Sequence, residues 1–372
     1  MKFTSIFFTA SAENLRVKPK KNKCQQTVVV NYIQKSYLRI TKRTQTRMKR
    51  YLHTTITAIV TSTILTSGYL LLSNEATGES NMPVSQIPYC VVSPAIPASI
   101  DFAGENITLT CHDRRERIDR EILAFTYSHT NTLLQIKRAN RLFPIVEPIL
   151  KECGVPDDFK YLMIIESNGD IHAQSPAGAA GLWQFMEKTG KEFGLEVNSY
   201  VDERYHIEKA TRAACSYLKK SYEKFGNWMS VAASYNAGMA NIARRAERQK
   251  EENAINMSLP AETSRYIFRL LAAKTIFSNP SSYGFILKKQ DLYPMLPVKE
   301  TLAIKNSVAS WADIAKKHSL TYIQLREANP WIRGSNLPNE HKKSYTVIIP
   351  DCEGLHYNPK ETQAHSYKWV LR

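Results

Sequence analysis

Tyr161–Gln184 reads YLMIIESNGDIHAQSPAGAAGLWQ, and the rest of the chain can be interpreted outward from it. A proline and two acids stand just before it and suit the first turn of a helix. Phe159, Leu162 and Glu166 recur at i, i+3 and i+7, which places them on one helix face. Gly169 is a suitable stop, because glycine adopts the left-handed cap conformation. The pattern predicts Glu166 on an apolar face in the last turn of a helix.

Such a position changes the acidity of a carboxyl group. Burial disfavours the carboxylate, and so does the negative end of a helix. Both effects favour the protonated form near neutral pH, which is the form that a general acid needs. Taken alone, the helix leaves a plainer alternative open, in which Glu166 faces water at a frayed helix end.

Further motifs follow over about 100 residues, beginning with the small-residue loop Ser175–Gly181, where backbone can approach a ligand closely. Together with the Glu166 helix they resemble the lytic transglycosylases of the goose-type lysozyme superfamily, whose motifs are Glu-Ser, Gly-Leu-Met-Gln, Ala-Tyr-Asn and Glu-Thr-x-x-Tyr. The corresponding residues here are Glu166-Ser167, Gly181-Leu182-Trp183-Gln184, Ser234-Tyr235-Asn236 and Glu262-Thr263-Ser264-Arg265-Tyr266. Tryptophan in place of methionine in the second motif is most similar to the membrane-bound type D branch.

The resemblance implies a mainly α, lysozyme-like transglycosylase domain, which we expect over residues 113–290. It implies cleavage of the MurNAc-GlcNAc β-1,4 bond of peptidoglycan glycan strands with 1,6-anhydroMurNAc ends, and Glu166 as the single acid and base. It needs no metal and no cofactor. The residues that it places against substrate are Ser175, Gln184, Met186, Tyr235, Asn236, Glu262 and Tyr266.

Each of these residues also has a structural reading when it is taken alone. Tyr235 and Asn236 can be a buried aromatic residue and a helix cap, and Glu262 an acid in a first helical turn. Two rival functions also remain open at this point. One is a goose-type hydrolase that admits water, and the other is a non-catalytic scaffold that binds peptidoglycan.

Apolar periodicity predicts helices and almost no strand between residues 113 and 280. Short extended pieces are expected before them, at 100–105 and 107–110. The expected helices begin near residue 113 and continue at 130–141, 143–153, 159–168, 187–193, 207–225, 228–236, 242–252 and 262–276.

A second module is expected at residues 298–350, with a strand near 302–304, helices at 310–318 and 321–329, and a strand at 345–350. This β-α-α-β order is similar to a LysM module, whose marks here are Ile314-Ala315, Leu325 to Asn329 and Ile349-Pro350. Val308-Ala309-Ser310 stands where Gly-Asp-Thr is usual in that family. The sequence leaves open whether the module binds glycan or serves packing.

The net charge of +16 is concentrated at the N-terminus. Residues 1–53 hold thirteen Lys and Arg beside a single acid, Glu13, so the remainder of the chain is only mildly basic. The distribution argues against a nucleic-acid-binding protein. Met48-Lys49-Arg50 resembles the start of an export signal, which suggests that translation begins at Met48. The alternative is a disordered basic tail.

Thr54–Leu72 is free of charge, with basic residues before it and acids after it. We expect a cleaved signal peptide or a retained signal anchor, and therefore a periplasmic enzyme held at the inner membrane if the segment is uncleaved. A buried helix is the alternative. Residues 73–112 are expected as a linker, in which Cys90 and Cys111 are candidates for a disulfide. The sequence gives no Cys-x-x-Cys and no indication of oligomeric state.

Overall fold

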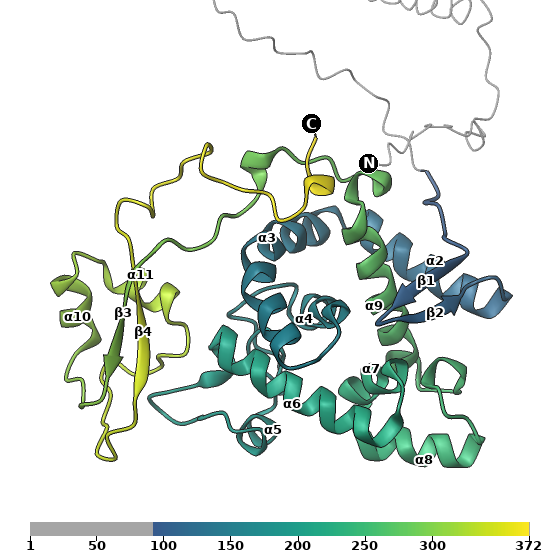
Figure 1. The fold of residues 1–372 in the computed structure, drawn as a ribbon, viewed down its shortest axis with the longest axis horizontal. Helices are drawn as coiled ribbons and strands as arrows, with labels where there is room; N and C mark the ends of the chain where they lie inside the picture. Colours follow the sequence, from purple (N-terminus) through teal and green to yellow (C-terminus); the bar gives the residue numbers. More distant parts are fainter. Residues whose placement is uncertain (1–91, 372) are drawn as a thin grey trace, which may run out of the picture. The chain divides into compact units, whose positions relative to one another are not determined.

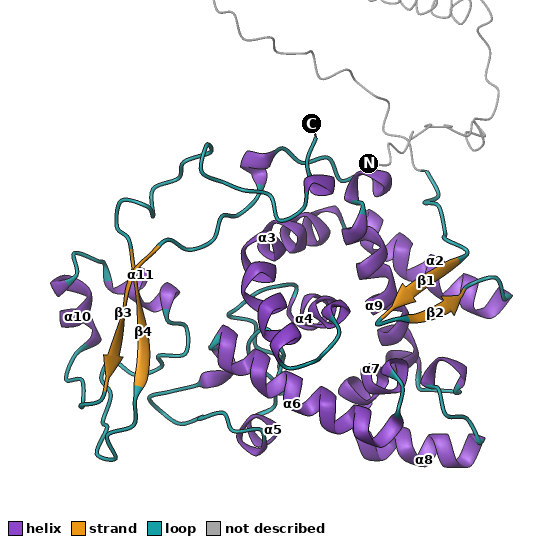
Figure 2. Cartoon of the chain, in the orientation of Figure 1, coloured by secondary structure: helices purple, strands orange, loops and turns teal. Residues whose placement is uncertain are grey.

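The computed structural model describes residues 92–371. They form a helical domain and a small module with two strands and two helices (Figures 1 and 2). No helix within this range is both long and apolar enough to cross a membrane, and Thr54–Leu72 lies outside it. The helices of the domain are α2 (His112–Tyr127), α3 (His129–Glu152), α4 (Lys160–Ser167), α5 (Glu187–Glu192), α6 (Ile207–Phe225), α7 (Trp228–Ala237), α8 (Met239–Gln249) and α9 (Ala261–Ser278).

Helix α4 is short and central, and it packs against α3 and α9 (Figure 1). Its residues Leu162, Met163 and Ile164 are completely buried, which explains why eight residues suffice for a stable helix. The predicted end is confirmed, with a small shift. The left-handed cap is Asn168 (φ 55°), and Gly169 follows with φ 64°.

Helix α3 corrects the prediction of two helices at 130–141 and 143–153. It is continuous through Pro144 and Pro148. Each proline removes one hydrogen bond from the helix. However, Phe143, Val146 and Leu150 lie on one completely buried face that spans the break, and their packing outweighs that loss.

The first strands lie within the stretch that we expected to be a linker. Strands β1 (Ser99–Phe102) and β2 (Glu105–Thr108) form an antiparallel hairpin. Phe102, Ile107 and Leu109 belong to the core of the helical domain. The Ala103 amide at its turn donates to Asp158 Oδ2 (2.6 Å), just before α4. The hairpin is therefore part of the packed domain. Cys90, the proposed partner of Cys111, is outside the described residues.

The module has the predicted β-α-α-β order, with β3 (Val298–Ile304), α10 (Trp311–Lys317), α11 (Tyr322–Ala328) and β4 (Tyr345–Pro350). Strands β3 and β4 are antiparallel. Ser310 and Thr321 cap the two helices by accepting from the N3 amide. The module core includes Trp311, Leu325 and Val347, and it also takes in Val201 from the helical domain.

Residues 351–371 return from the module to the helical domain, and we call them the C-terminal strap. Trp369 anchors it: the indole is buried against Phe143 and Phe277, and its Nε1 donates to the Phe277 carbonyl oxygen (2.6 Å). The Asn140 side chain also holds the strap, because it donates to the Gln363 carbonyl oxygen and accepts from the His365 amide.

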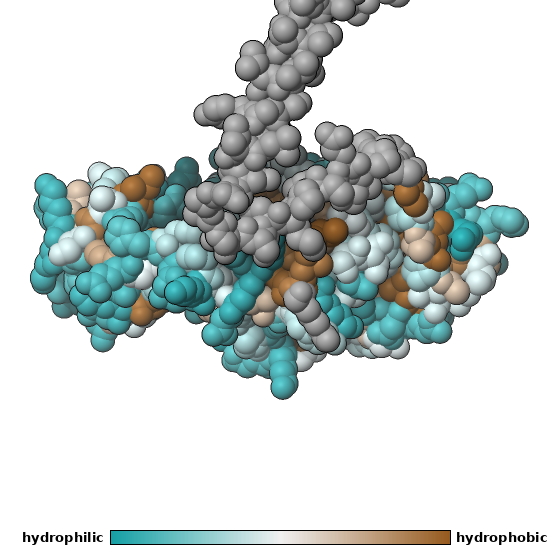
Figure 3. All heavy atoms as spheres, turned by 90° about the horizontal axis from the view of Figure 1, so that it is seen from above, coloured by the Kyte–Doolittle hydropathy of each residue, from teal (hydrophilic) through white to brown (hydrophobic). Residues whose placement is uncertain are grey.

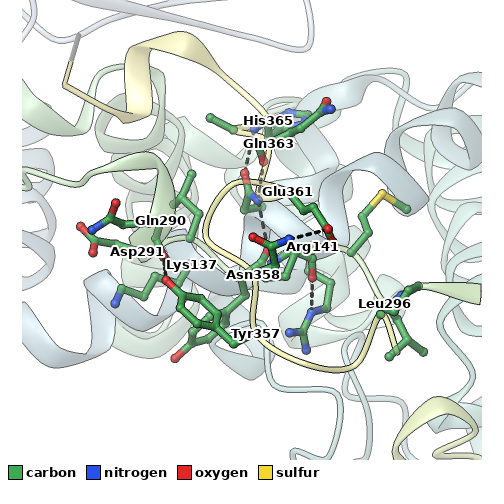
Figure 4. Close-up of a pocket in the computed structure, with 18 of the residues that line it drawn as sticks. Lys137, Arg141, Gln290, Asp291, Leu296, Tyr357, Asn358, Glu361, Gln363 and His365 are labelled. Atoms are coloured by element: carbon green, nitrogen blue, oxygen red, sulfur yellow. Dashed lines mark hydrogen bonds between the residues drawn. The ribbon is translucent and has the colours of Figure 1, made fainter. Parts of the chain in front are cut away.

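A hollow of about 870 Å³ lies between α3, the strap and residues 290–297 (Figure 4). Arg141 lines it and donates from Nε to the Pro294 carbonyl oxygen, and burial lowers the pKa of the Arg141 guanidinium. Basic and acidic side chains alternate around the hollow, so it favours neither sign of ligand charge. None of the residues predicted to contact substrate lines it.

We expect Trp369→Ala to lower the free energy of unfolding by about 3–5 kcal/mol, because it opens a cavity between Phe143 and Phe277 and leaves a carbonyl unpaired. Trp369→Phe, which keeps a ring, should cost clearly less. Urea unfolding monitored by far-UV circular dichroism measures both. Equal, small losses would mean that the strap does not support the core.

Candidate active site

Glu166 lies in the last turn of α4 and is partly buried. Its Oε1 accepts a hydrogen bond of 2.6 Å from the hydroxyl of Tyr266 on α9. Two of the sequence motifs, Glu166-Ser167 and Glu262–Tyr266, are thus in contact across 100 residues of sequence. The contact fixes one oxygen of the carboxyl group and leaves the other as the proton-carrying position.

The pKa of Glu166 is raised to about 7. Burial is the main cause, and the negative charge of Glu262 adds to it. The hydrogen bond from Tyr266 and the positive charge of Arg269 act in the opposite direction, but they are weaker. A carboxyl group with this pKa gives and takes protons near neutral pH, as a general acid and base must.

Two tyrosines interact electrostatically with the Glu166 carboxyl group. Tyr266 is buried, and Tyr235 on α7 is partly buried against Phe185 and Tyr217. Burial and the charge of Glu166 raise the pKa of both hydroxyls well above 10, so both stay protonated. Tyr235 donates its proton to the Trp183 carbonyl oxygen (2.8 Å), not to Glu166. It therefore fixes the loop that carries Gln184.

That loop presents Gln184 in a strained conformation, with φ 48°. Its Nε2 donates to the carbonyl oxygens of Ala173 (3.1 Å) and Gly181 (2.8 Å). Because both partners are acceptors, the amide nitrogen must face them, and Oε1 is the end available to a ligand. Ser175 closes the same loop: its Oγ accepts from the Ala179 amide (3.0 Å).

A buried ion pair supports this loop from behind. Arg204 binds Asp202 through two hydrogen bonds, Nε to Oδ1 (2.9 Å) and Nη2 to Oδ2 (2.7 Å). Its Nη1 then donates to the carbonyl oxygens of Gly178 and Phe185, on either side of the Gln184 turn. Both side chains are almost completely buried. We call Arg204 and Asp202 the loop brace.

The module contacts the same brace. The Asp202 amide donates to the Trp331 carbonyl oxygen (2.8 Å), and Val201 pairs with Ile332 as an isolated bridge. Glu196 accepts from Tyr345 of β4 and also pairs with Lys343. The segment that holds the loop brace is thus itself held by the module.

The remaining predicted residues take different places. Met186 is exposed beside the loop, Asn236 is half-buried in the last turn of α7, and Glu262 is exposed in the first turn of α9. The contacts of the described residues do not tie Met186 or Asn236 to Glu166, so their contact with substrate stays a prediction. Ser167 is structural: its Oγ donates to the Met163 carbonyl oxygen.

The sequence analysis missed a buried charge cluster beside the site. Glu121 of α2 is almost completely buried, and its Oε1 lies 2.9 Å from Nε of both Arg120 and Arg265. Nε of Arg269, whose positive charge acts on Glu166, lies 3.8 Å from the other carboxylate oxygen of Glu121, Oε2. The sequence does contain a signal for this cluster. Glu121 interrupts the apolar face of Ile118, Ile122 and Phe125, and Arg265 and Arg269 stand at i and i+4 on α9.

Within residues 92–371, no group of three or more His, Cys, Asp or Glu is placed to hold a metal ion. The second acid near the motif, Asp170, is engaged with Arg138 (3.2 Å) and with the His172 amide. Asp170 is thus held in an ion pair, whereas the pKa of the Glu166 carboxyl group is raised.

The raised pKa of Glu166 makes stability depend on pH. An unfolded glutamate has a pKa near 4.5, so the folded state loses stability as pH rises from 4.5 through 7. We expect Glu166→Gln to stabilise the protein by about 2–3 kcal/mol at pH 8 and by little at pH 4. Chemical unfolding at the two pH values tests this. The exposed Glu247→Gln serves as the control and should show no such pH dependence.

Gly181 gives a test of the loop brace. A Cβ there would lie 1.9 Å from the Arg204 carbonyl oxygen, whereas a Cβ at Gly194 meets nothing within 4 Å. Both glycines have positive φ, 75° and 87°, so alanine is strained at either position by about 1–2 kcal/mol. Gly181→Ala should cost several kcal/mol more than Gly194→Ala in urea unfolding. Equal losses would show that the contact with Arg204 is not tight.

Comparison with known proteins gives matches to two family models. Residues 145–258 match the family model described as "Transglycosylase SLT domain", and residues 300–353 match "Soluble lytic transglycosylase C-terminal LysM-like domain". Membrane-bound lytic murein transglycosylase D of Escherichia coli (strain K12) is 30% identical over 244 residues, which are 63% of this chain. They are 52% of that protein, so the chain spans about half the length of the curated relative it matches.

Two solved structures are similar to parts of this chain. The 70 kDa soluble lytic transglycosylase from Escherichia coli is 21% identical, with a TM-score of 0.33, over 44% of this chain and 30% of that one. Lytic transglycosylase Slt from Pseudomonas aeruginosa is 20% identical, with a TM-score of 0.30, over 36% of this chain and 23% of that one. The two resemblances inferred from sequence motifs are confirmed by the family models: the chain carries a transglycosylase SLT domain over residues 145–258 and a C-terminal LysM-like domain over residues 300–353.

Proposed function

We propose that this protein is a peptidoglycan lytic transglycosylase. It cleaves the MurNAc-GlcNAc β-1,4 bond and leaves 1,6-anhydroMurNAc ends, with Glu166 as its single acid and base. The observation that carries the proposal is the Glu166 carboxyl group itself: partly buried, hydrogen-bonded to Tyr266, and with a pKa of about 7. The transglycosylase SLT domain that contains it supports the same reading.

The proposed reaction moves two protons through one carboxyl group. Protonated Glu166 gives its proton to the glycosidic oxygen as the C1–O bond of MurNAc breaks. The Glu166 carboxylate then takes the proton of the 6-hydroxyl group of the same sugar while O6 bonds to C1. Glu166 is restored, no water is consumed, and the leaving GlcNAc carries a free 4-hydroxyl group.

The surrounding residues suit this reaction physically. Tyr266 holds one carboxyl oxygen, so the proton is carried by the other one. Gln184 offers Oε1 to an N–H or O–H donor, for which the N-acetyl group of the sugar is the natural candidate. Ser175, Met186, Asn236 and Glu262 belong to the proposed groove through the motif resemblance.

The proposed location is the periplasm. Thr54–Leu72, preceded by Lys49 and Arg50, would direct export and, if it is retained, attach the protein to the inner membrane. The proposed partner is the peptidoglycan glycan strand. The comparison with a membrane-bound murein transglycosylase supports the same compartment.

Digestion of purified peptidoglycan by the full chain, with products weighed by mass spectrometry, tests the function. Wild type should release anhydro-ended fragments, which are about 18 Da lighter than hydrolytic ones because no water is added. Glu166→Gln should lower the rate at least about 100-fold. Glu247→Gln on α8 is the matched control and should leave the rate unchanged.

Other products would change the conclusion. Hydrated ends from wild type would make the protein a lysozyme-like hydrolase. Absence of cleavage by a correctly folded wild type would favour a peptidoglycan-binding scaffold.

The pH profile tests the role of Glu166 separately. Since the acid must be protonated, kcat/KM should fall as pH rises above about 7. Tyr266→Phe removes a hydrogen bond that lowers the pKa of Glu166, so the fall should move to higher pH. A profile that is identical in the two proteins would contradict the assignment of this limb to Glu166.

A further inference from the structure

One face of the helical domain carries exposed apolar and lysine side chains together. Two neighbouring segments, 285–289 and 367–371, form it, and they are joined where the Leu371 amide donates to the Leu287 carbonyl oxygen (2.9 Å). We call this surface the lysine face. Its exposed residues are Ile286, Lys288, Lys289, Tyr367, Lys368 and Leu371.

The lysine face has a fixed backbone. Residues 285–288 are extended, and burial alternates along them: Phe285 and Leu287 point into the core, whereas Ile286 and Lys288 point outward. The second segment is anchored by Trp369, which is buried against Phe277. Ile286 is 64% exposed and Leu371 55%, so a firmly held surface offers aliphatic side chains to its surroundings.

The charge of this surface is mainly positive, with three lysines beside one carboxylate, Asp291. Segments 92–100, 279–290 and 362–371 contain Lys288, Lys289 and Lys368 but no Asp or Glu. The nearest acid along the chain, Asp291, turns back to accept from the Lys288 amide. The face therefore presents a positive charge next to apolar side chains and a tyrosine.

The described chain also starts near this face. The Tyr283 hydroxyl, three residues before Ile286, donates to the Ala95 carbonyl oxygen (3.4 Å). The residues that lead into β1 and the C-terminal end of the strap both lie on the uppermost side of Figure 1. Seen from above, this side has hydrophobic patches between hydrophilic ones (Figure 3). Upstream, the 20 residue steps from Leu72 to Val92 can span at most about 72 Å.

We propose that the lysine face rests on an anionic lipid surface. Lysines beside aliphatic and tyrosine side chains are the chemistry that binds the boundary of an anionic membrane. A protein partner fits less well, because lysine is depleted where proteins bind each other. Thr54–Leu72 is separated from Val92 by 19 residues, so chain length alone allows the described residues to reach a membrane that this segment enters. The inference does not depend on the proposed reaction.

The test uses the full chain bound to vesicles and recovered by flotation. One set of vesicles contains phosphatidylglycerol and phosphatidylethanolamine, and the other contains phosphatidylcholine alone. Hydrogen–deuterium exchange is then followed in peptides covering 283–291 and 366–371. We expect exchange there to be slower on the anionic vesicles than on the neutral ones, and the difference to shrink as salt is added.

Variants assign the effect to the lysine face. Ile286→Ser with Lys288→Gln and Lys368→Gln should abolish the difference between the two vesicles. The matched control lies on the module and combines Ile323→Ser with Lys316→Gln and Lys317→Gln. Ile323 is 66% exposed, close to the 64% of Ile286, and both lysines are exposed. The control should keep the full difference. Circular dichroism verifies that each variant is folded.

Four results would overturn the proposal. The full chain could fail to float with anionic vesicles, or the peptides could exchange equally slowly on both kinds of vesicle. The lysine-face variant could keep the difference in exchange between the vesicles, or the module control could lose it. Protection that grows with protein concentration without vesicles would instead identify a second copy of the chain as the occupant, and it would also reject the lipid surface.

Discussion

The buried ion pair between Arg204 and Asp202 is the interaction on which the site depends most. A charged pair taken out of water stabilises a fold only when its remaining hydrogen-bonding groups are also satisfied. Arg204 meets this condition by binding the carbonyl oxygens on either side of the Gln184 turn. The Asp202 carboxylate meets it by accepting from Nε, Nη2 and the amide of Arg204. The same bonds that satisfy the charges therefore fix the loop that carries Gln184.

Glu166 shows the opposite use of burial. Its carboxyl group has one close donor, Tyr266, and its environment raises its pKa to about 7, so the folded protein is less stable above that pH. The carboxylate of Asp202 is paired differently, because it accepts two hydrogen bonds from the guanidinium group of Arg204. The chain thus gives the two carboxyl groups different partners. The difference in partners separates a structural role from a chemical one.

Local sequence rules predicted the elements whose ends and faces lie within one segment. Helix α6 runs from Ile207 to its Gly226 cap as expected, and the β-α-α-β order of the module followed from strand and cap patterns. Those rules failed where contacts between segments distant in sequence determine the structure. They broke α3 at Pro144, and they did not anticipate that Trp369 fills the core or that Glu121 binds arginines from α9. The motif order located Glu166 and Tyr266, but nothing local to Arg204 reveals that it supports the loop.

The C-terminal strap also has a consequence for biosynthesis. The module is inserted between α9 and Trp369, so the last large side chain of the helical core is made only after the whole module. A nascent chain that has finished α9 still lacks the indole that lies against Phe143 and Phe277. The helical domain therefore cannot complete its core while the module is still being translated. A product truncated within the module would lack Trp369 and leave that core open. Correct folding of the helical domain therefore requires synthesis of the chain through residue 369.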